Sequence, residues 1–258
     1  MLLEICVDSV ESAIAAEGGG ACRVELCSDL LEGGITPSAG LIEKVRRHVQ
    51  IDVFVMIRPR AGDFLYTSHE FDTMKTDIDR AKMSGADGVV VGILAADGCV
   101  DVERTRKLVE AAAPLPVTFH RAVDVSADRA DSLERIIASG AQRVLTSGGQ
   151  KRAADGVREV AQMVSQAACR IAIMTGGGLN AENIRAVAER TGAAEFHAGL
   201  ATRIPSPMRY RNGALFLGAD PDREYSRYVV MEEDVRRLRN MLDQLESERQ
   251  VEAENRQP

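Results

Sequence analysis

A Gly-Ala pair recurs where a helical pattern gives way to an apolar, strand-like run, and this repeat constrains the fold more than any other feature. The pair stands at residues 20–21, 85–86, 140–141 and 192–193, so its period is roughly 50 to 65 residues. Each period has room for two strand-plus-helix units. The sequence therefore predicts the eight alternating strands and helices that close a parallel (β/α)8 TIM barrel. An open doubly wound sheet would not require this regularity and is the alternative.

The expected strands are short apolar runs at Leu2–Val7, Arg23–Ser28, Val53–Arg58, Gly88–Leu94, Val117–Arg121, Arg143–Ser147, Arg170–Met174 and Glu195–Gly199. Helices are expected between them at about 9–18, 36–49, 69–84, 101–112, 126–139, 154–167 and 181–190. Thr36 is expected to cap the second of these helices and Asn180 the seventh. Residues 200–228 show no clear periodicity. A charged helix over about 231–250 would complete one barrel domain of residues 1–250, followed by a disordered polar tail over 251–258.

Composition narrows the classes of partner. The chain has 258 residues and a formal charge of −7. This balance argues against a nucleic-acid or anionic-membrane surface, because phosphate groups bind clustered cations, and it favours a small molecule or a metal ion. No apolar run approaches the roughly 20 residues of a membrane span, and no signal peptide is visible. We therefore expect a cytoplasmic location, or a nuclear one, in which the five cysteines are reduced thiols.

The first two expected strands both carry Glu-x-Cys, as Glu4-Ile-Cys6 and Glu25-Leu-Cys27. Side chains alternate along a strand, so each glutamate shares a face with its cysteine. Neighbouring strands would then form a pocket of two carboxylates and two thiols. One interpretation is that the cysteines are small buried apolar residues. The other is a soft-metal site: Cu(I) accepts two or three sulfur ligands, whereas structural zinc normally needs four ligands. Met56 or Met174 would supply a thioether.

Other polar residues are expected at the C-terminal ends of the strands, where barrels of this type place their active sites. Those that can carry chemistry are Glu4, Glu25, Arg58 and His120. One interpretation is a satisfied polar layer in which Arg58 pairs with a buried carboxylate. The other is a catalytic centre, in which Arg58 binds an anion and Glu4, Glu25 or His120 acts as acid or base.

Two glycine-rich loops follow the sixth and seventh expected strands, Ser147-Gly148-Gly149 and Thr175-Gly176-Gly177-Gly178. Loops at this place in a barrel often bind phosphate through backbone N–H groups. Tight turns between a strand and a helix explain the same glycines. The candidates for an anion site are Arg58, Ser147, Gly176, Gly177 and Gly178.

Seven segments together make the chain recognisable, at residues 4–13, 24–28, 33–38, 55–64, 117–122, 143–148 and 195–198. They include Val-Met-Ile-Arg-Pro-Arg-Ala-Gly-Asp-Phe and Val-Thr-Phe-His-Arg-Ala. The chain resembles the CutC family of copper homeostasis proteins over nearly all of residues 1–230, and its animal members in particular, because it has both Cys6 and Cys27. The resemblance implies a (β/α)8 barrel, a cytoplasmic homo-oligomer, and Cu(I) held by these two cysteines.

Three hypotheses follow. The first is an intracellular copper homeostasis protein that binds Cu(I) through Cys6 and Cys27. The alternative is a TIM-barrel enzyme acting on a small phosphorylated or carboxylated substrate, with Arg58 and the Gly176–Gly178 loop as its anion site. A third is a scaffold in which residues 200–228 form the interface between subunits.

Overall fold

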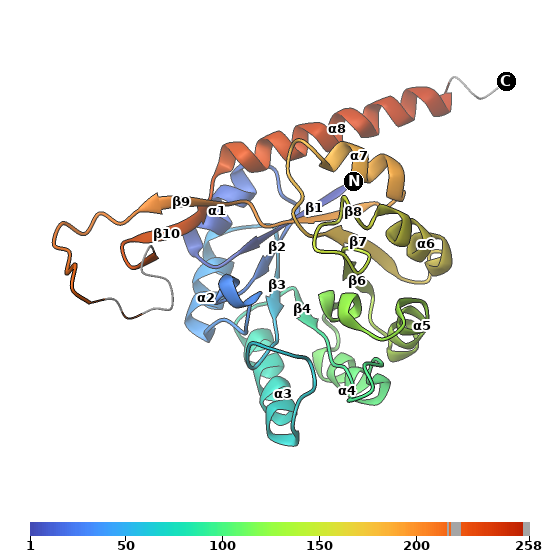
Figure 1. The fold of residues 1–258 in the computed structure, drawn as a ribbon, viewed down its shortest axis with the longest axis horizontal. Coiled ribbons are helices and arrows are strands. Elements are labelled where there is room, and N and C mark those ends of the chain that lie inside the picture. The colour runs from blue at the N-terminus through green and yellow to red at the C-terminus, as the bar shows by residue number, and fades with distance from the viewer. Residues whose placement is uncertain (216, 218–222, 255–258) are drawn as a thin grey trace.

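The computed structural model describes residues 1–215, 217 and 223–254, and they form a closed barrel of eight parallel strands (Figure 1). The strands are β1 (Leu2–Val7), β2 (Arg23–Leu26), β3 (Asp52–Met56), β4 (Gly88–Val91), β5 (Val117–Phe119), β6 (Arg143–Thr146), β7 (Ala172–Gly176) and β8 (Glu195–Ala198). Each strand pairs with the next in sequence, and β8 pairs with β1. The predicted (β/α)8 barrel is confirmed, and the open sheet is excluded.

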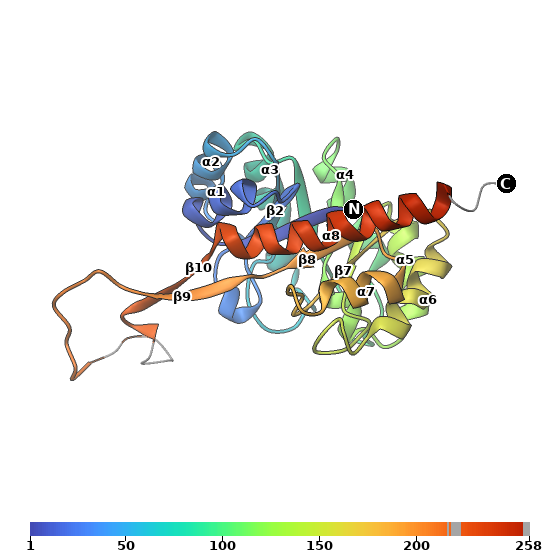
Figure 2. The ribbon, with the colours of Figure 1, turned by 90° about the horizontal axis from the view of Figure 1, so that it is seen from above.

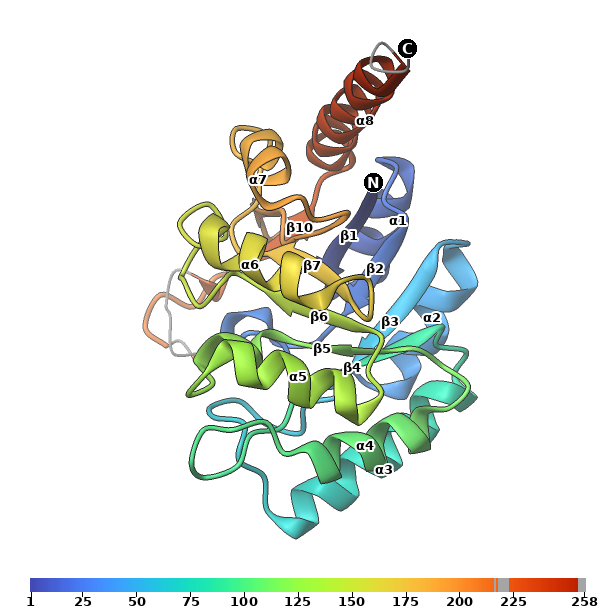
Figure 3. The same ribbon diagram turned by 90° about the vertical axis from the view of Figure 1, so that its right-hand side faces the viewer.

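Helices surround the barrel: α1 (Val10–Gly18), α2 (Ala39–His48), α3 (Ser68–Met83), α4 (Val102–Ala112), α5 (Arg129–Ser139), α6 (Val157–Ala167), α7 (Ile184–Thr191) and α8 (Glu232–Glu254). The C-terminal helix α8 packs against both α1 and α7, as Figure 3 shows, so it is the eighth outer helix that the sequence predicts. It continues to Glu254. Residues 251–254 of the expected tail are therefore helical, and residues 255–258 lie outside the described residues.

Two helix caps differ from the prediction. Ser38, not Thr36, caps α2: its Oγ accepts the N–H of Leu41 at 3.2 Å. The Thr36 hydroxyl is occupied elsewhere, because it accepts the N–H of Arg58 at 2.9 Å. Asn180 caps the turn before α7 rather than the helix, which begins at Ile184. The cap of α2 thus lies two residues after the predicted one, whereas no side-chain hydrogen bond caps the first residues of α7.

An antiparallel hairpin, which the sequence did not predict, leaves the barrel after β8. Its strands are β9 (Ala201–Pro205) and β10 (Ser226–Val230), and it projects away from the barrel in Figure 2. Its base is anchored to the barrel: Val230 is buried and donates its N–H to Ser12 Oγ at 3.1 Å. None of the described helices is long and apolar enough to cross a membrane.

Side chains alternate along β1, so the strand contributes to two buried regions: the apolar core between strands and helices, and the inside of the barrel. Leu3, Ile5 and Val7 face outward into the apolar core beneath the helices. Glu4 and Cys6 therefore face into the barrel, as the period-two pattern predicts. The inside of the barrel is consequently polar near β1, β2 and β8, and every charge there needs a partner.

Candidate metal centre

The two predicted cysteines meet inside the barrel. Cys6 ends the inward face of β1 and Cys27 directly follows β2; both are buried, and their Sγ atoms lie 3.8 Å apart. Glu25 adds an oxygen 3.6 Å from the Cys27 sulfur. Gly34 approaches this sulfur so closely that a Cβ there would lie 2.9 Å from it, and the positive φ of Gly34 also favours glycine. The donor atoms of Cys6, Glu25 and Cys27 all lie within 4.8 Å of one another.

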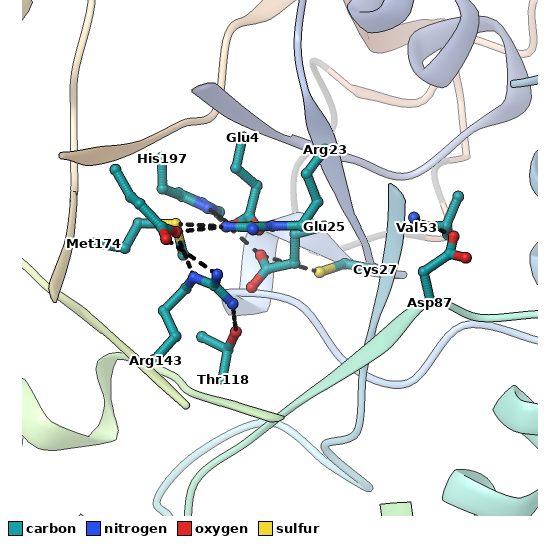
Figure 4. A network of polar contacts seen from close by, with 11 residues as sticks. Glu4, Arg23, Glu25, Cys27, Val53, Asp87, Thr118, Arg143, Met174 and His197 are labelled. Atoms are coloured by element: carbon teal, nitrogen blue, oxygen red, sulfur yellow. Dashed lines mark hydrogen bonds and ion pairs between the residues drawn. The ribbon is translucent and has the colours of Figure 1, made fainter. Parts of the chain in front are cut away.

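A histidine and a second carboxylate extend this group. His197 on β8 is the register partner of Glu4 on β1, and its Nδ1 lies 2.6 Å from Glu4 Oε1. Its Nε2 lies 3.8 Å from Glu25 Oε2. Glu4, Glu25 and His197 therefore form a second set of donors within 4.8 Å, next to the thiols. Figure 4 shows His197, Glu4 and Glu25 converging from three strands.

A layer of ion pairs lies next to the carboxylates. Arg23 pairs through Nε with Glu4 and through Nη2 with Glu195, at 3.1 Å in the second case. Arg143 pairs with the same Glu195 and reaches Thr118 Oγ1 at 3.5 Å (Figure 4). These contacts neutralise the carboxylates and link β1, β2, β5, β6 and β8.

The interpretation that Arg58 pairs with a buried carboxylate is therefore wrong: the partner of Glu4 is Arg23. Arg23 stands beside Glu4 in the parallel register of β1 and β2. The sequence carried a signal for it, because Arg23, Glu25 and Cys27 are spaced two residues apart and share one face of the strand. The prediction missed it by searching only the C-terminal ends of the strands.

Opposing effects set the charges of Glu4 and His197. Burial alone would raise the pKa of Glu4, but the hydrogen bond from His197 and the charge of Arg23 lower it to about 2. Burial alone would lower the pKa of His197, but the neighbouring Glu25, Cys6 and Glu4 raise it well above its usual value. At neutral pH the pair is therefore a carboxylate and an imidazolium.

The two thiols titrate as a pair. The hydrogen bond from Cys27 lowers the pKa of Cys6 to about 5, with further help from His197 and against the effect of burial. The same interaction, together with burial, raises the pKa of Cys27 well above its usual value. Burial and the charge of Cys6 likewise raise the pKa of Glu25. At neutral pH the cluster therefore holds one thiolate and one thiol, next to the Glu25 carboxyl group, whose pKa is raised above its usual value.

A cavity of about 500 Å³ opens over the cluster. Its walls come from most strands of the barrel and from the loops at their carboxyl ends. They are Cys6, Glu25, Leu30, Glu32, Gly33, Met56, Arg58, Phe64, His120, Arg121, Leu145, Gly177, Gly178, His197, Gly199 and Ala201. Most of the predicted site residues therefore face one space.

Arg58 is held in the cavity wall by backbone groups. Its Nη1 donates to the carbonyl oxygens of Glu32 and Gly34 at 2.6 and 3.0 Å, and its Nη2 donates to that of Gly62 at 2.8 Å. The Nε of Arg58 has no acceptor within the described part of the chain, and no carboxylate there lies within ion-pair distance of the guanidinium. Although its side chain is only 5% exposed, Arg58 is thus a cation without a counter-ion among the described residues.

His120 has one nitrogen engaged and one free. Its Nδ1 accepts the N–H of Ala122 at 3.1 Å, so the ring proton lies on Nε2. This Nε2 is buried without a partner among the residues that the structure describes. Burial and the charge of Arg58 lower the pKa of His120 to about 3. At neutral pH the ring is therefore uncharged and presents an N–H donor.

Comparison with known proteins settles the family. The family model described as CutC family matches residues 1–202. The chain belongs to the CutC family. It is 48% identical to the "Copper homeostasis protein cutC homolog" of Mus musculus, over 93% of this chain and 88% of the mouse protein. It is 47% identical to the human protein of the same name, over 93% and 87% of the two chains.

Solved structures agree with this assignment. The crystal structure of the CutC protein from Streptococcus agalactiae is 35% identical, with a TM-score of 0.73 over 76% of this chain and 97% of that one. Thiamine phosphate pyrophosphorylase from Pyrococcus furiosus is 16% identical, with a TM-score of 0.59 over 95% of this chain and 96% of that one, and shares the fold alone.

In this CutC barrel the hydrogen-bond donors of the loop after β6 are already paired with a carboxylate of the chain itself, that of Asp124. The Asp124 carboxylate accepts the N–H of Ser147 at 3.0 and 3.1 Å, the N–H of Gly149 at 3.0 Å, and the Ser147 hydroxyl at 2.9 Å. Asp124, which the sequence analysis did not single out, thus satisfies the donors that an external anion would need. The contacts favour a structural turn at Ser147.

The loop after β7 differs, because its N–H groups remain available. Gly177 and Gly178 line the cavity with φ angles of +118° and +68°. Within the described residues their N–H groups have no acceptor. Gly176 is needed for a different reason: a Cβ there would lie 2.6 Å from Leu145 Cδ1. Of the residues predicted to bind an anion, Gly177 and Gly178 thus have backbone N–H groups without an acceptor, and Arg58 has a charge without a carboxylate partner, among the described residues.

Proposed function

We propose that the chain binds one Cu(I) ion through Cys6 and Cys27 and takes part in copper homeostasis. The observation that carries this proposal is the pair of buried sulfur atoms 3.8 Å apart, of which that of Cys6 belongs to a residue that lines the cavity. Soft thiolate ligands select Cu(I) over harder ions. The relatives named copper homeostasis proteins support the same role.

Met56 and Met174 are the two predicted sources of a thioether as third ligand of Cu(I). Met56 belongs to the buried cluster that contains Cys6 and Cys27, so its thioether is placed to contribute. The Met174 sulfur instead lies 3.3 Å from Arg23 Nη2, in the ion-pair layer. His197 lies beside the thiols, but as an imidazolium it has no free lone pair and would coordinate a metal only after losing a proton. Residues 1–215, 217 and 223–254 provide no four-ligand set of the kind that structural zinc requires.

A competition titration tests the proposal. Under anaerobic, reducing conditions, the chain should take about one Cu(I) from a chelator, and the Cys6→Ser, Cys27→Ser double variant should take none. The matched control is Cys22→Ser with Cys169→Ser, which removes two exposed thiols instead. Equal binding by the two double variants would contradict a site at the buried pair.

We also propose that the protein works as a homo-oligomer in the cytoplasm or the nucleus, where its thiols stay reduced. The projecting hairpin supports the oligomer, because it exposes four large apolar side chains, Met208, Tyr210, Leu215 and Leu217. The variant Tyr210→Ser with Leu217→Ser should lower the molar mass measured by light scattering. Met83→Ser on α3, 77% exposed, is the control that should leave the mass unchanged.

A second candidate function is an enzyme that acts on a small anionic compound. The observation that favours it is Arg58, a buried cation in the cavity wall that has no carboxylate partner among the described residues. Binding of small anions by the wild-type chain is the first test, because such a function requires it.

A further inference from the structure

We propose that the cavity binds a small oxyanion, a carboxylate or phosphate that also carries a carbonyl or hydroxyl oxygen, between Arg58 after β3 and His120 after β5. The proposal rests on the second candidate function and deepens it. It assigns His120 the role of a fixed hydrogen-bond donor in place of the predicted acid or base.

The first argument is the charge of Arg58. A cation removed from water needs a nearby anion, and the other buried arginine, Arg23, has two carboxylates. Three carbonyl oxygens accept hydrogen bonds from Nη1 and Nη2 of Arg58 and hold the guanidinium in place, but they carry no net charge. A ligand anion in the cavity would supply the missing countercharge.

The second argument is the free nitrogen of His120. The ring is 4% exposed and is held in place by Ala122 and by the ring of Phe64, whose centroid lies 4.9 Å away. A buried donor without an acceptor destabilises the folded protein, so an unpaired Nε2–H at this place indicates a binding site for an acceptor. An oxygen of a bound ligand would be that acceptor.

Further donors lie on the same side of the cavity. The free N–H groups of Gly177 and Gly178 come from the β7 loop, and a Cβ at Gly177 would lie 3.5 Å from the guanidinium carbon of Arg121. The carboxylates that line the cavity, Glu25 and Glu32, belong to β2 and the segment that follows it, and the carbonyl oxygen of Glu32 also contacts Arg58. The donors thus stand on β3, β5 and β7, and the thiols on the β1 and β2 side.

The size of the cavity agrees with a small metabolite. Sites for such ligands are concave and measure roughly 300–1,000 Å³, with few polar groups that fix the orientation. The apolar side chains in the cavity wall include those of Met56, Phe64 and Leu145. The class of ligand is therefore a compact carboxylate or phosphate rather than a nucleotide polymer or a lipid.

Calorimetric titration of the full chain tests the proposal with three probes: inorganic phosphate, 2-phosphoglycolate and L-malate. His120→Asn keeps an acceptor for the Ala122 N–H but removes the donor at Nε2. His120→Gln places an amide N–H near the Nε2 position. We expect the best-bound probe to bind about ten- to hundredfold more weakly to His120→Asn, and to recover with His120→Gln.

Charge is tested separately. Arg58→Met should weaken the same probe, whereas Arg129→Met, which removes a half-buried arginine outside this cavity, should not. Thermal unfolding of each variant confirms that it is folded. If a probe binds equally to wild type and every variant, binding between Arg58 and His120 is contradicted, while the second candidate function, which requires only that the protein binds an anion, is not. If no probe binds to the wild type, both the assignment and the second candidate function fall.

Discussion

Glu4 is the residue on which the charge balance inside the barrel depends. One of its oxygens contacts His197 Nδ1 at 2.6 Å and the other pairs with Arg23, and its side chain is fully buried. Breaking a buried pair leaves an uncompensated charge and costs about 3–5 kcal/mol. Glu4 thus holds the imidazole beside Cys6 and anchors the layer of arginines next to it.

Glu4→Gln should therefore lower the free energy of unfolding by about 3–5 kcal/mol at pH 7, because Arg23 and His197 lose their shared counter-ion. Urea unfolding measures this difference. Glu134→Gln is the matched control, because Glu134 pairs with Arg170 on the surface, where a salt bridge is worth about 0–1 kcal/mol. An equal loss in both variants would contradict the importance of the buried carboxylate.

The pH dependence of this loss has a definite sign. The pKa of Glu4 is lowered from 4.5 to about 2, so its stabilisation is complete above pH 4.5 and is lost as the pH falls through about 2. The pKa of His197 is raised above 6.5, so its contribution is complete below pH 6.5 and is lost as the pH rises through the higher folded value. The difference between wild type and Glu4→Gln should therefore shrink between pH 4.5 and 2.

Cys6 should ionise at a pH far below that at which an ordinary thiol ionises. Its pKa of about 5, caused chiefly by the hydrogen bond from Cys27, makes it a thiolate at neutral pH. In a chain with Cys22→Ser, Cys99→Ser and Cys169→Ser, the ultraviolet absorbance of one thiolate should appear with a midpoint near pH 5. Adding Cys27→Ser should move the midpoint upward. A first midpoint near pH 9 would contradict the paired state.

At the scale of elements, α8 is held by a close approach to the end of α1. A Cβ on Gly19 would lie 2.5 Å from Val235 Cβ and 2.7 Å from the carbonyl oxygen of Glu232. Val235 is fully buried there. The φ of Gly19 is −81°, so glycine is needed for space and not for backbone conformation.

Gly19→Ala should consequently destabilise the protein by about 1–3 kcal/mol, as overpacking does. Gly40→Ala on α2 is the opposite case, because the nearest atom to its Cβ is 4.0 Å away and alanine favours helix by up to about 1 kcal/mol. Chemical unfolding of both variants gives the comparison. A Gly19→Ala protein as stable as wild type would show that α8 can shift without cost.

At the scale of the whole molecule, the fold was predictable because local and global signals agree. The Gly-Ala repeat, the apolar strands and the capped helices all indicate one barrel. The hairpin was not predictable, because β9 and β10 pair across a long connection and lack an alternating apolar face. The Cys6–Cys27 contact followed from the period of two in neighbouring strands.

The ion-pair and hydrogen-bond partners inside the barrel were harder to predict from the sequence. Arg23 and Glu195 lie at the starts of strands, and only the strand register places them beside Glu4 and Arg143. Arg58 was left with two interpretations, an ion-pair partner or an anion-binding residue, because sequence does not show which backbone carbonyls surround a side chain. Asp124 was missed because it lies after β5 and reaches Ser147, 23 residues later in the chain, at the end of the neighbouring strand β6.

Copper should stabilise the whole molecule if the site forms only in the folded barrel. A ligand that binds the native state alone adds about 2.7 kcal/mol at 100 times its dissociation constant, so the thermal midpoint should rise with Cu(I). Unfolded thiols would bind Cu(I) too and reduce the effect. The experiment therefore uses the chain with Cys22→Ser, Cys99→Ser and Cys169→Ser, scanned with and without Cu(I) under anaerobic conditions. Adding Cys6→Ser and Cys27→Ser should abolish the rise. If the rise persists in that chain, the ion binds elsewhere and the cysteine pair is not the copper site.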